Sequence, residues 1–275
     1  MVQKNILVSI LINNFNNQKY IKKSIYSTLN QNYKNIEIIV YDDKSTDNSK
    51  RIIDGIKSNK LIKIYNKFKK TNSAPLNQLN AIYNSFDQSK GDIIFLLDGD
   101  DFFSEQKVKS IVDIFNKNKH INFIQDNPTY YFPKTKKMKL NKLKTKIFPN
   151  HTWPYFNPTS TMVFKRKFLK YLLKEIRFSK SNYKNIFFDA RAFIYIHFFE
   201  KKFIQIDESF TFYTQNELGD TISKYQNKNL IWWKRRKEYH QYVSDLFKRK
   251  NKFHLKLFDY YLTNIIVKFF NLIIK

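Results

Sequence analysis

The stretch Gly91-Asp-Ile-Ile-Phe-Leu-Leu-Asp-Gly-Asp-Asp101 joins an unbroken apolar run to a cluster of acids. The run is short and bounded by turn residues, which is typical of a strand buried on both faces. Three carboxylates follow in the last four positions, at the strand end where open α/β sheets bind ligands. Like charges this close repel each other, and a divalent cation would relieve the repulsion. The stretch predicts a metal site for a phosphorylated ligand. The alternative is a solvated acidic turn that caps a helix at Ser104.

Two earlier segments have the same organisation. The apolar run Ile6 to Ile12 leads into the polar loop Asn13 to Asn17, and the run Ile36 to Tyr41 leads into Asp42 and Asp43. Helical patterns separate these runs from one another and from a further short strand at 61–65, which predicts βαβ units in a parallel sheet. The three polar loops would then share one sheet edge. The first turn has no Gly-x-Gly-x-x-Gly pattern and the chain has no Gly-x-x-x-x-Gly-Lys loop, which argues against dinucleotide and P-loop sites.

Composition limits the class of protein. The chain has 275 residues, of which 42% are hydrophobic, with 27 Phe and 18 Tyr but only 4 Gly, so a compact fold is expected. The absence of Cys excludes thiolate metal sites and fits a reducing compartment. The N-terminal residues show no signal-peptide pattern, so a cytoplasmic protein is expected. A net charge of +27 implies an anionic partner, unless it reflects a general bias toward Lys.

The order and spacing of three motifs resemble family 2 glycosyltransferases. The motifs are Val8 to Asn16, Ile39 to Asp47 and Phe95 to Asp101. The resemblance implies a GT-A (Rossmann-like) domain over residues 1–222, with a donor half to about 118 and an acceptor half from about 119. A helical, basic extension over 223–275 is expected to follow. The implied reaction is inverting transfer of a sugar from a nucleotide diphosphate, with UDP as the expected nucleotide, to a hydroxyl of a cell-surface glycan or lipid-linked acceptor.

The same resemblance implies roles for single residues on the donor side. It assigns nucleotide-sugar binding to Asn13, Phe15, Asn16, Asp42, Asp43, Asp98 and Gly99. Asp98-Gly99-Asp100 matches the Asp-x-Asp motif, which implies Mg²⁺ or Mn²⁺ with Asp100 as the direct ligand and Asp98 on a ribose hydroxyl or a metal-bound water. Asp101 is expected to support the loop. The cation would stabilise the charge that develops on the leaving diphosphate.

On the acceptor side, the resemblance concerns two segments. Asn157 to Phe168 is similar to an acceptor-side strand, in which Thr159 and Ser160 would contact a sugar hydroxyl, unless they are ordinary strand residues. Asp189 stands near the start of the helical segment 187–197, where the family carries its general base. Asp189 could instead satisfy the helix N-terminus, and Glu175 is the substitute candidate. His197 is expected to be packed rather than catalytic.

One motif departs from the family. Tyr213 to Asn216 stands where the family usually has Tyr-Arg-x-His, which puts a phosphate contact from this loop in doubt. Lys224 and His240 are the candidates to replace it.

The basic segments suggest contact with an anionic surface. The stretch Lys134 to Lys146 is either a solvated loop or an electropositive loop near an anionic acceptor or membrane. Trp232 to Arg236 is a cluster typical of membrane interfaces. Residues 255–274 are too polar and too short for a transmembrane helix, so they either lie in the membrane interface or pack on the core. Peripheral association with the inner face of a membrane is therefore expected.

Three other classes compete with this interpretation. A nucleic-acid-binding protein would use the positive charge, but the acidic loops would repel phosphate backbones, so nucleic acid is not the expected partner. A nucleotidyltransferase would need a Gly-rich basic first loop, and Asn13 to Asn17 contains no Gly, Lys or Arg. A non-catalytic glycosyltransferase homologue would fit the altered Tyr213 to Asn216 but not the intact Asp98-Gly99-Asp100.

Overall fold

A computed structural model of the protein describes residues 5–141, 156–177, 183–215, 229–253 and 258–273. The part of the predicted basic loop beyond Asn141, the predicted domain boundary at 222 and Lys224 lie outside the described residues.

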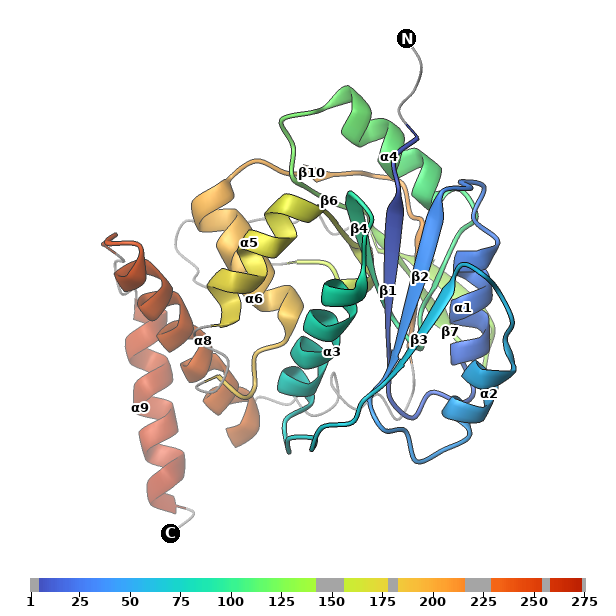
Figure 1. The fold of residues 1–275 in the computed structure, drawn as a ribbon. Helices are drawn as coiled ribbons and strands as arrows, with labels where there is room; N and C mark the ends of the chain where they lie inside the picture. The colour runs from blue at the N-terminus through green and yellow to red at the C-terminus, as the bar shows by residue number, and fades with distance from the viewer. Residues whose placement is uncertain (1–4, 142–155, 178–182, 216–228, 254–257, 274–275) are drawn as a thin grey trace.

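A seven-stranded sheet forms the centre of the molecule (Figure 1), in the order β10-β6-β9-β4-β1-β2-β3. β1, β2, β3 and β4 are parallel to one another, and β9 runs antiparallel between β4 and β6. The strands are β1 (Val8–Asn14), β2 (Ile36–Asp42), β3 (Leu61–Tyr65), β4 (Ile93–Asp98), β6 (Phe123–Gln125), β9 (Met162–Lys165) and β10 (Ile204–Gln205). The predicted α/β class with a mostly parallel sheet is confirmed.

Helices cover both faces of this sheet because the central strands are apolar on both sides. In β1, Ile10 and Ile12 enter one core and Leu11 enters the other, as the period-2 alternation of a strand requires. The first core is covered by α1 (Ile21–Leu29), α2 (Ser49–Gly55) and α4 (Lys107–Lys117). The second is covered by α3 (Ala74–Gln88), α5 (Arg166–Arg177) and α6 (Phe188–Tyr195), which continues as a π-helical turn over Ile196–Glu200.

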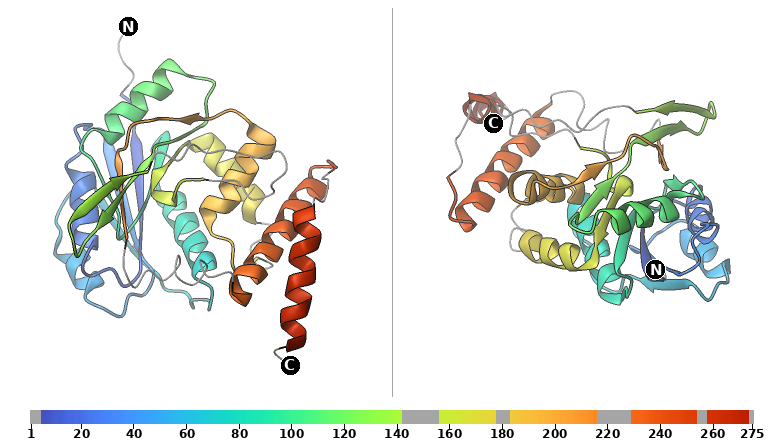
Figure 2. Two further views of the ribbon diagram at one scale, coloured as in Figure 1. Left: turned by 180° about the vertical axis from the view of Figure 1, so that it is seen from behind. Right: turned by 90° about the horizontal axis from the view of Figure 1, so that it is seen from above.

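A smaller sheet in the order β5-β11-β7-β8 lies beside the large one. Its strands are β5 (Phe102–Phe103), β7 (Pro128–Phe132), β8 (Lys137–Leu140) and β11 (Thr211–Thr214). Figure 2 shows the green β7 and β8 at the edge of the molecule. β8 corrects the expectation of a loop at this place: backbone pairing with β7 makes the Lys-rich segment a strand although all four of its residues are exposed.

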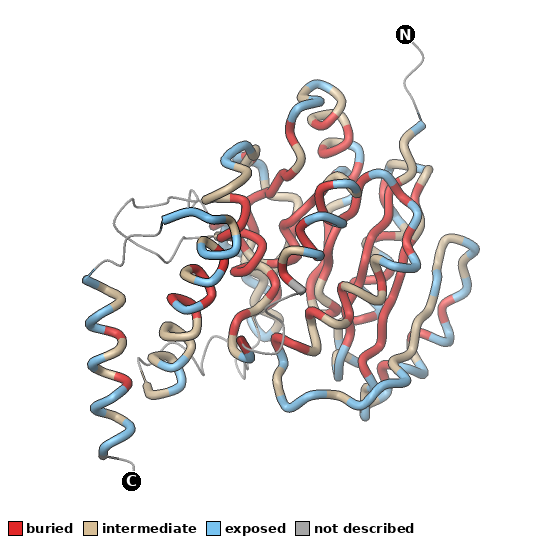
Figure 3. Tube along the Cα trace, turned by 60° about the vertical axis from the view of Figure 1, so that its left-hand side comes forward, coloured by how far each residue is buried: buried red, intermediate tan, exposed pale blue. Residues whose placement is uncertain are grey.

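Two helices end the described chain, α8 (Leu230–Arg249) and α9 (Phe258–Ile273). Tyr239, Tyr242 and Leu246 of α8 are fully buried and belong to the same core as α5 and α6. α9 packs beside α8 and is largely exposed (Figure 3). The expected C-terminal helices are therefore present. No described helix is both long and apolar enough to cross a membrane.

Candidate active site

The carboxyl ends of β1, β2 and β4 bring the three predicted loops together. Asn13 of β1 stands in register with Tyr41 of β2 on one side and with Asp98 of β4 on the other. The backbone N–H of Gly99 donates to the carbonyl oxygen of Asn13 at 2.8 Å. A Cβ atom at Gly99 would lie 2.8 Å from Oδ1 of Asn14, so only glycine lets the acidic turn approach the first loop this closely.

Hydrogen bonds hold the first two loops against each other. Nδ2 of Asn14 donates to Oδ1 of Asp42 at 2.7 Å, and the backbone N–H of Ser45 donates to Oδ2 of Asp42 at 3.0 Å. Oδ1 of Asn16 accepts from the backbone N–H of Thr46 at 2.8 Å. Asp42 and Asn16, both predicted to bind the donor, are thus hydrogen-bonded within the protein.

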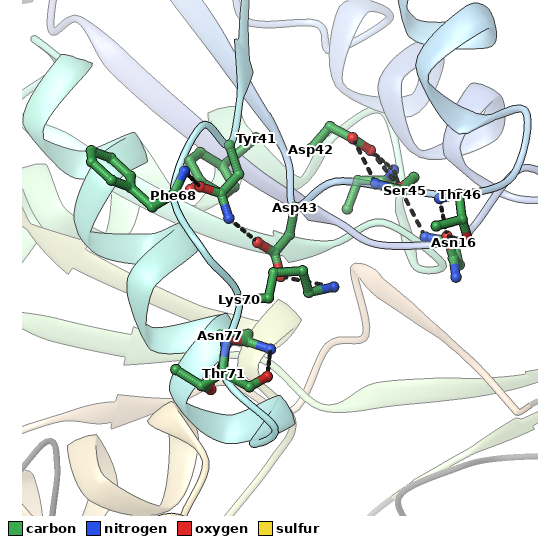
Figure 4. A network of polar contacts seen from close by, with 12 residues as sticks. Asn16, Tyr41, Asp42, Asp43, Ser45, Thr46, Phe68, Lys70, Thr71 and Asn77 are labelled. Atoms are coloured by element: carbon green, nitrogen blue, oxygen red, sulfur yellow. Dashed lines mark hydrogen bonds and ion pairs between the residues drawn. The ribbon is translucent and has the colours of Figure 1, made fainter.

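Asp43 faces a different set of partners. Nδ2 of Asn66 donates to its carboxylate at 2.6 Å, and Nζ of Lys70 lies 3.2 Å from it. The same Nζ lies 2.9 Å from the centroid of the Phe15 ring, which is 47% exposed. Figure 4 shows Asp42 turned toward Ser45 and Asp43 turned toward Lys70. The structure therefore places Phe15 and Asp43 in one group with a lysine that the sequence analysis missed.

A cavity of about 170 Å³ adjoins this group. Its lining consists of amides, two aromatic rings and two lysines: Tyr41, Asn66, Phe68, Lys69, Lys70, Asn77, Asn80 and Asn84. Amides beside aromatic rings suit a flat ligand with hydrogen-bonding edges. Three of the lining residues are asparagines of α3 (Asn77, Asn80 and Asn84), and these polar positions are the signal that the sequence carries for the cavity.

Asn13 has an unusual environment. Its side chain is 9% exposed, and within the described part of the chain neither its amide nitrogen nor its amide oxygen has a hydrogen-bond partner. A buried polar group without a partner is unfavourable by about 1–3 kcal/mol. A bound ligand would satisfy it.

The acidic turn is fastened by its last member, Asp101. Its carboxylate accepts from Oγ of Ser160 at 2.5 Å and from the backbone N–H of Thr214 at 2.8 Å. Oγ of Ser160 also accepts from the backbone N–H of Asp98 at 3.0 Å. Ser160 is fully buried, so its hydroxyl serves the acidic turn, whereas a contact with an acceptor had been expected. Asp101 supports the loop, as predicted.

A buried lysine lies beneath this turn. Nζ of Lys107 lies 2.9 Å from Oδ1 of Asp126 and donates to the carbonyl oxygen of Ser160 at 2.9 Å, and both charged side chains are fully buried. No sequence pattern predicts this pair. The only signal was a lysine directly before the apolar positions of α4, where any surface helix could carry one.

We expect Lys107→Met to lower the free energy of unfolding by about 3–5 kcal/mol, because it leaves the buried Asp126 carboxylate without its positively charged partner. Chemical denaturation would measure the change. Lys109→Met is the matched control, because Lys109 lies on the same helix and is exposed. Equal stability of the two variants would contradict the assignment of Lys107 as the counter-ion of Asp126.

Asp98 and Asp100 are the carboxylates available to a cation. Burial, together with the charges of Asp100 and Asp189, raises the pKa of Asp98 to about 7, and burial raises the pKa of Asp100 to about 6. No side chain in the described ranges donates a hydrogen bond to the Asp100 carboxylate. Oxygen ligands with unrelieved negative charge fit Mg²⁺ or Mn²⁺, which would neutralise them.

Protein ligands alone do not complete such a site. Among the described residues, no group of three or more His, Cys, Asp or Glu side chains is arranged to hold a metal ion. Mg²⁺ needs only one or two carboxylates when phosphate oxygens and waters supply the rest. The acidic turn therefore fits a cation that binds together with a phosphorylated ligand.

Gln78 of α3 links the acidic turn to the acceptor half. Its Nε2 lies 3.3 Å from Oδ1 of Asp98 and 3.4 Å from Oγ1 of Thr159, and its Oε1 accepts from the backbone N–H of Phe188 at 3.3 Å. Phe188 directly precedes Asp189 at the start of α6. One side chain thus brings Asp98, Thr159 and the Asp189 helix together.

Asp189 interacts electrostatically with the acidic turn. Its charge raises the pKa of Asp98, and burial raises its own pKa to about 6 against the lowering effects of the Ala190 N–H and the Arg235 guanidinium. The backbone N–H of Ala190 donates to its carboxylate at 2.7 Å, so Asp189 also satisfies the helix N-terminus. Arg235 comes from α8, and its guanidinium carbon lies 5.8 Å from the Phe187 ring centroid.

The substitute candidates lie elsewhere. Glu175 forms an ion pair with Lys250 at 2.9 Å. His240 is buried between α8 and α9, with Nε2 3.1 Å from Asp259, and it does not replace the missing family histidine. His197 packs against Phe198, and burial lowers its pKa to about 4.

The model of glycosyl transferase family 2 matches residues 9–190, which include the acidic turn and Asp189. The chain belongs to this family. The match covers all three donor loops and the segment that carries Thr159.

Several curated proteins are similar in sequence to one segment of this chain. An uncharacterised glycosyltransferase from Nostoc sp. is 29% identical over 59% of the chain. The Escherichia coli UDP-Glc:alpha-D-GlcNAc-diphosphoundecaprenol beta-1,3-glucosyltransferase WfaP is 36% identical over 46%, as is the Bacillus subtilis minor teichoic acid biosynthesis protein GgaA. The matched segments span 52%, 47% and 28% of the lengths of these three relatives.

Solved structures show the same GT-A fold at low identity. S. aureus TarS in complex with UDP-GlcNAc is similar over 95% of this chain and 70% of that one, with a TM-score of 0.58 and 14% identity. The mannosyltransferase PcManGT from Pyrobaculum calidifontis, in complex with GDP-Man and Mn²⁺, is similar over 95% and 69%, with a TM-score of 0.54 and 13% identity.

The acidic site predicts how stability responds to pH. Asp98 and Asp100 bind protons more tightly in the folded chain than in the unfolded one, so their contribution to stability is present at acidic pH and is lost as pH rises through 6 and 7. We expect the melting temperature without divalent cations to fall between about pH 5 and pH 8. Asp100→Asn should reduce this fall, and Asp87→Asn, at an exposed position of α3, should not. Identical pH profiles for both variants would contradict the assignment.

Proposed function

We propose that this glycosyltransferase moves a sugar, with inversion, from a UDP-sugar to a hydroxyl of a lipid-linked or cell-surface glycan acceptor, in the cytoplasm of a bacterium. The single observation that carries the proposal is that Gln78 joins the acidic turn at the end of β4 to the start of α6, which carries Asp189. The family membership adds the reaction class.

The donor nucleotide is proposed to bind along β1 and β2. Phe15, Asp43 and the amide-lined cavity beside Lys70 suit a base and ribose, because they combine rings, amides and a carboxylate that accepts ribose hydroxyls. Asn13 would gain the hydrogen bonds that it lacks. UDP is proposed because TarS binds UDP-GlcNAc and WfaP is named for a UDP-Glc donor.

The diphosphate is proposed to lie over the acidic turn with Mg²⁺ or Mn²⁺. Asp100 and Asp98 would hold the cation, which when bound supplies Lewis-acid stabilisation of the leaving diphosphate. Gly99 keeps this turn against the first loop, and Asp101 with Ser160 keeps its backbone fixed. The solved structure of PcManGT, which has the same fold, is a complex with GDP-Man and Mn²⁺.

Asp189 is proposed as the general base. A pKa of about 6 leaves the carboxylate ionised at neutral pH yet basic enough to take the acceptor hydroxyl's proton as the oxygen attacks the sugar. In this proposal the activated hydroxyl attacks the face of the sugar opposite the leaving diphosphate, which inverts the anomeric carbon. Thr159 would lie on the acceptor side. The acceptor class is taken from WfaP and GgaA, whose names refer to a diphosphoundecaprenol-linked sugar and teichoic acid.

Calorimetric titration of UDP, GDP and dTDP, each with Mn²⁺ and with EDTA, tests the donor site first. We expect UDP to bind with Mn²⁺ and to bind much more weakly with EDTA. Equal binding in EDTA would overturn the metal site, and preference for GDP or dTDP would overturn the UDP proposal. The anomeric configuration of the product from a UDP-sugar, read by NMR, would then test inversion.

A further inference from the structure

α9 is held against α8 by polar contacts although most of its residues are apolar. Thr263 and Val267 are its buried residues, and Asp259 and the ring of Tyr260 also face α8. Arg236 of α8 bonds both Asp259 and Thr263, and His240 approaches Asp259 at 3.1 Å. The polar contacts therefore fasten α9 to the protein.

The opposite face of α9 is apolar and exposed. It consists of Phe258, Tyr261, Leu262, Ile265, Phe269 and Leu272, which are 36–79% exposed. At 3.6 residues per turn these six positions fall within about a third of the helix circumference, so they form one continuous stripe. We name them the α9 stripe. A contiguous exposed apolar stripe on a helix marks a binding surface.

We infer that the α9 stripe lies on the surface of an anionic membrane, with the helix axis in the membrane plane. The sixteen residues of α9 give a length of about 24 Å, which is shorter than the hydrocarbon core of about 30 Å, so the helix would lie in the interface.

Charge favours a membrane over other occupants. The chain carries a net charge of +27, and a second copy would bring the same positive charge against it. Lys248, Arg249 and Lys252 are exposed at the end of α8, near the start of α9, and Lys268 is exposed on α9 itself. Asp259, which belongs to α9, is turned inward and paired, so it does not repel anionic lipid. Apolar contact beside positive charge is the combination that binds anionic membrane surfaces.

Position supports the same partner. α8 carries Arg235 to the neighbourhood of Asp189, so the helix to which α9 is fastened also lines the proposed acceptor side. Figure 1 shows α8 and α9 along one side of the molecule, with the free end of α9 pointing in the direction in which β1 and β2 run. A membrane bound along α9 would therefore lie beside α8, the helix that carries Arg235 to the proposed acceptor side.

Co-sedimentation of the full chain with vesicles tests the inference. We expect binding to vesicles of phosphatidylcholine with phosphatidylglycerol, at least tenfold weaker binding to phosphatidylcholine alone, and at least a tenfold loss on anionic vesicles for the double variant Ile265→Ser, Phe269→Ser. Tyr26→Ser, Ile62→Ser is the matched control, because both residues are exposed on other elements. The control should bind as the natural chain does.

Three outcomes would overturn the inference. One is no binding of the natural chain to anionic vesicles. A second is equal binding by the stripe variant, which would leave charge alone as the cause. The third is a natural chain that does not bind vesicles but forms a dimer in sedimentation velocity, while the stripe variant is a monomer. This result would assign the stripe to contact with a second copy of the chain. UDP titration of the stripe variant tests the donor site separately. Failure of the membrane inference and failure of the donor-site proposal can therefore be distinguished.

Discussion

Asp100→Asn is expected to reduce sugar transfer by about 10²–10³-fold and to remove the Mn²⁺ dependence of UDP binding. The Asp100 carboxylate is half-buried near two other acids and receives no side-chain hydrogen bond in the described part of the chain, so a cation is the partner that it lacks. An amide at this position is similar in size but carries no charge and holds a divalent cation poorly. Calorimetry with Mn²⁺ and with EDTA, together with release of UDP from UDP-glucose or UDP-GlcNAc, would measure both effects.

The same variant should be more stable than the natural chain when no metal is present. The negative charge of Asp100 is one of the causes that raise the pKa of Asp98 to about 7, and the variant removes this repulsion. We therefore expect the free energy of unfolding to increase by about 1–2 kcal/mol at neutral pH. Loss of activity with a gain in stability cannot come from unfolding. Asp87→Asn is the control for a lost surface carboxylate. Retained Mn²⁺ dependence in Asp100→Asn would refute the metal role of Asp100.

Asp189→Asn is expected to lower kcat by about 10²–10⁴-fold while UDP binding with Mn²⁺ stays within about twofold of the natural chain. An amide cannot take a proton from the acceptor hydroxyl, but it can still accept the hydrogen bond from the Ala190 N–H, so the start of α6 should keep its conformation. Steady-state transfer to a lipid-diphosphate sugar, with UDP titration in parallel, would separate the two effects. An equal loss of binding and turnover would assign Asp189 to the donor site instead.

The pH profile gives an independent test of Asp189. With its pKa at about 6, the rate should rise with pH and level off above about pH 6–7. Arg235→Met should move this limb to higher pH, because the guanidinium lowers the pKa of Asp189. Asp207→Asn, an exposed acid on another segment, is the control and should leave the profile unchanged. If the rate of Arg235→Met rises over the same pH range as that of the natural chain, the group that titrates is not Asp189.

The agreement between prediction and structure depends on how local each signal is. The apolar runs and the polar loops that follow them specify buried parallel strands, and the three acidic or amide loops meet because parallel strands end at the same edge. The fold class, the family and the place of the acidic turn could therefore be predicted from the order and spacing of short segments. The Lys-rich segment that forms β8 could not, because its pairing with β7 depends on the backbone and leaves all four side chains exposed.

The roles of individual residues within the site were harder to predict from the sequence. Asp42 and Asp43 are neighbours with the same side chain, yet one bonds Asn14 and Ser45 while the other faces Lys70 and the cavity. Asp42 is the last residue of β2 and Asp43 is the first residue of the loop that follows, and the partners of each come from distant positions. Lys70 and Asn66 reach Asp43 only because β3 and the segment after it fold back beside β2.

The sequence was sufficient for a GT-A glycosyltransferase with Asp98, Gly99 and Asp100 at a strand end, because periodicity and motif spacing are properties of contiguous residues. Tertiary structure alone decided that Lys107 is the buried counter-ion of Asp126, that Gln78 joins the acidic turn to the start of α6, and that Asp259 of α9 pairs with Arg236 of α8. In each case the deciding partner lies at least 19 residues away in the chain. Whether a charged or polar side chain is paired, and so which face of its element is buried, depends on that partner.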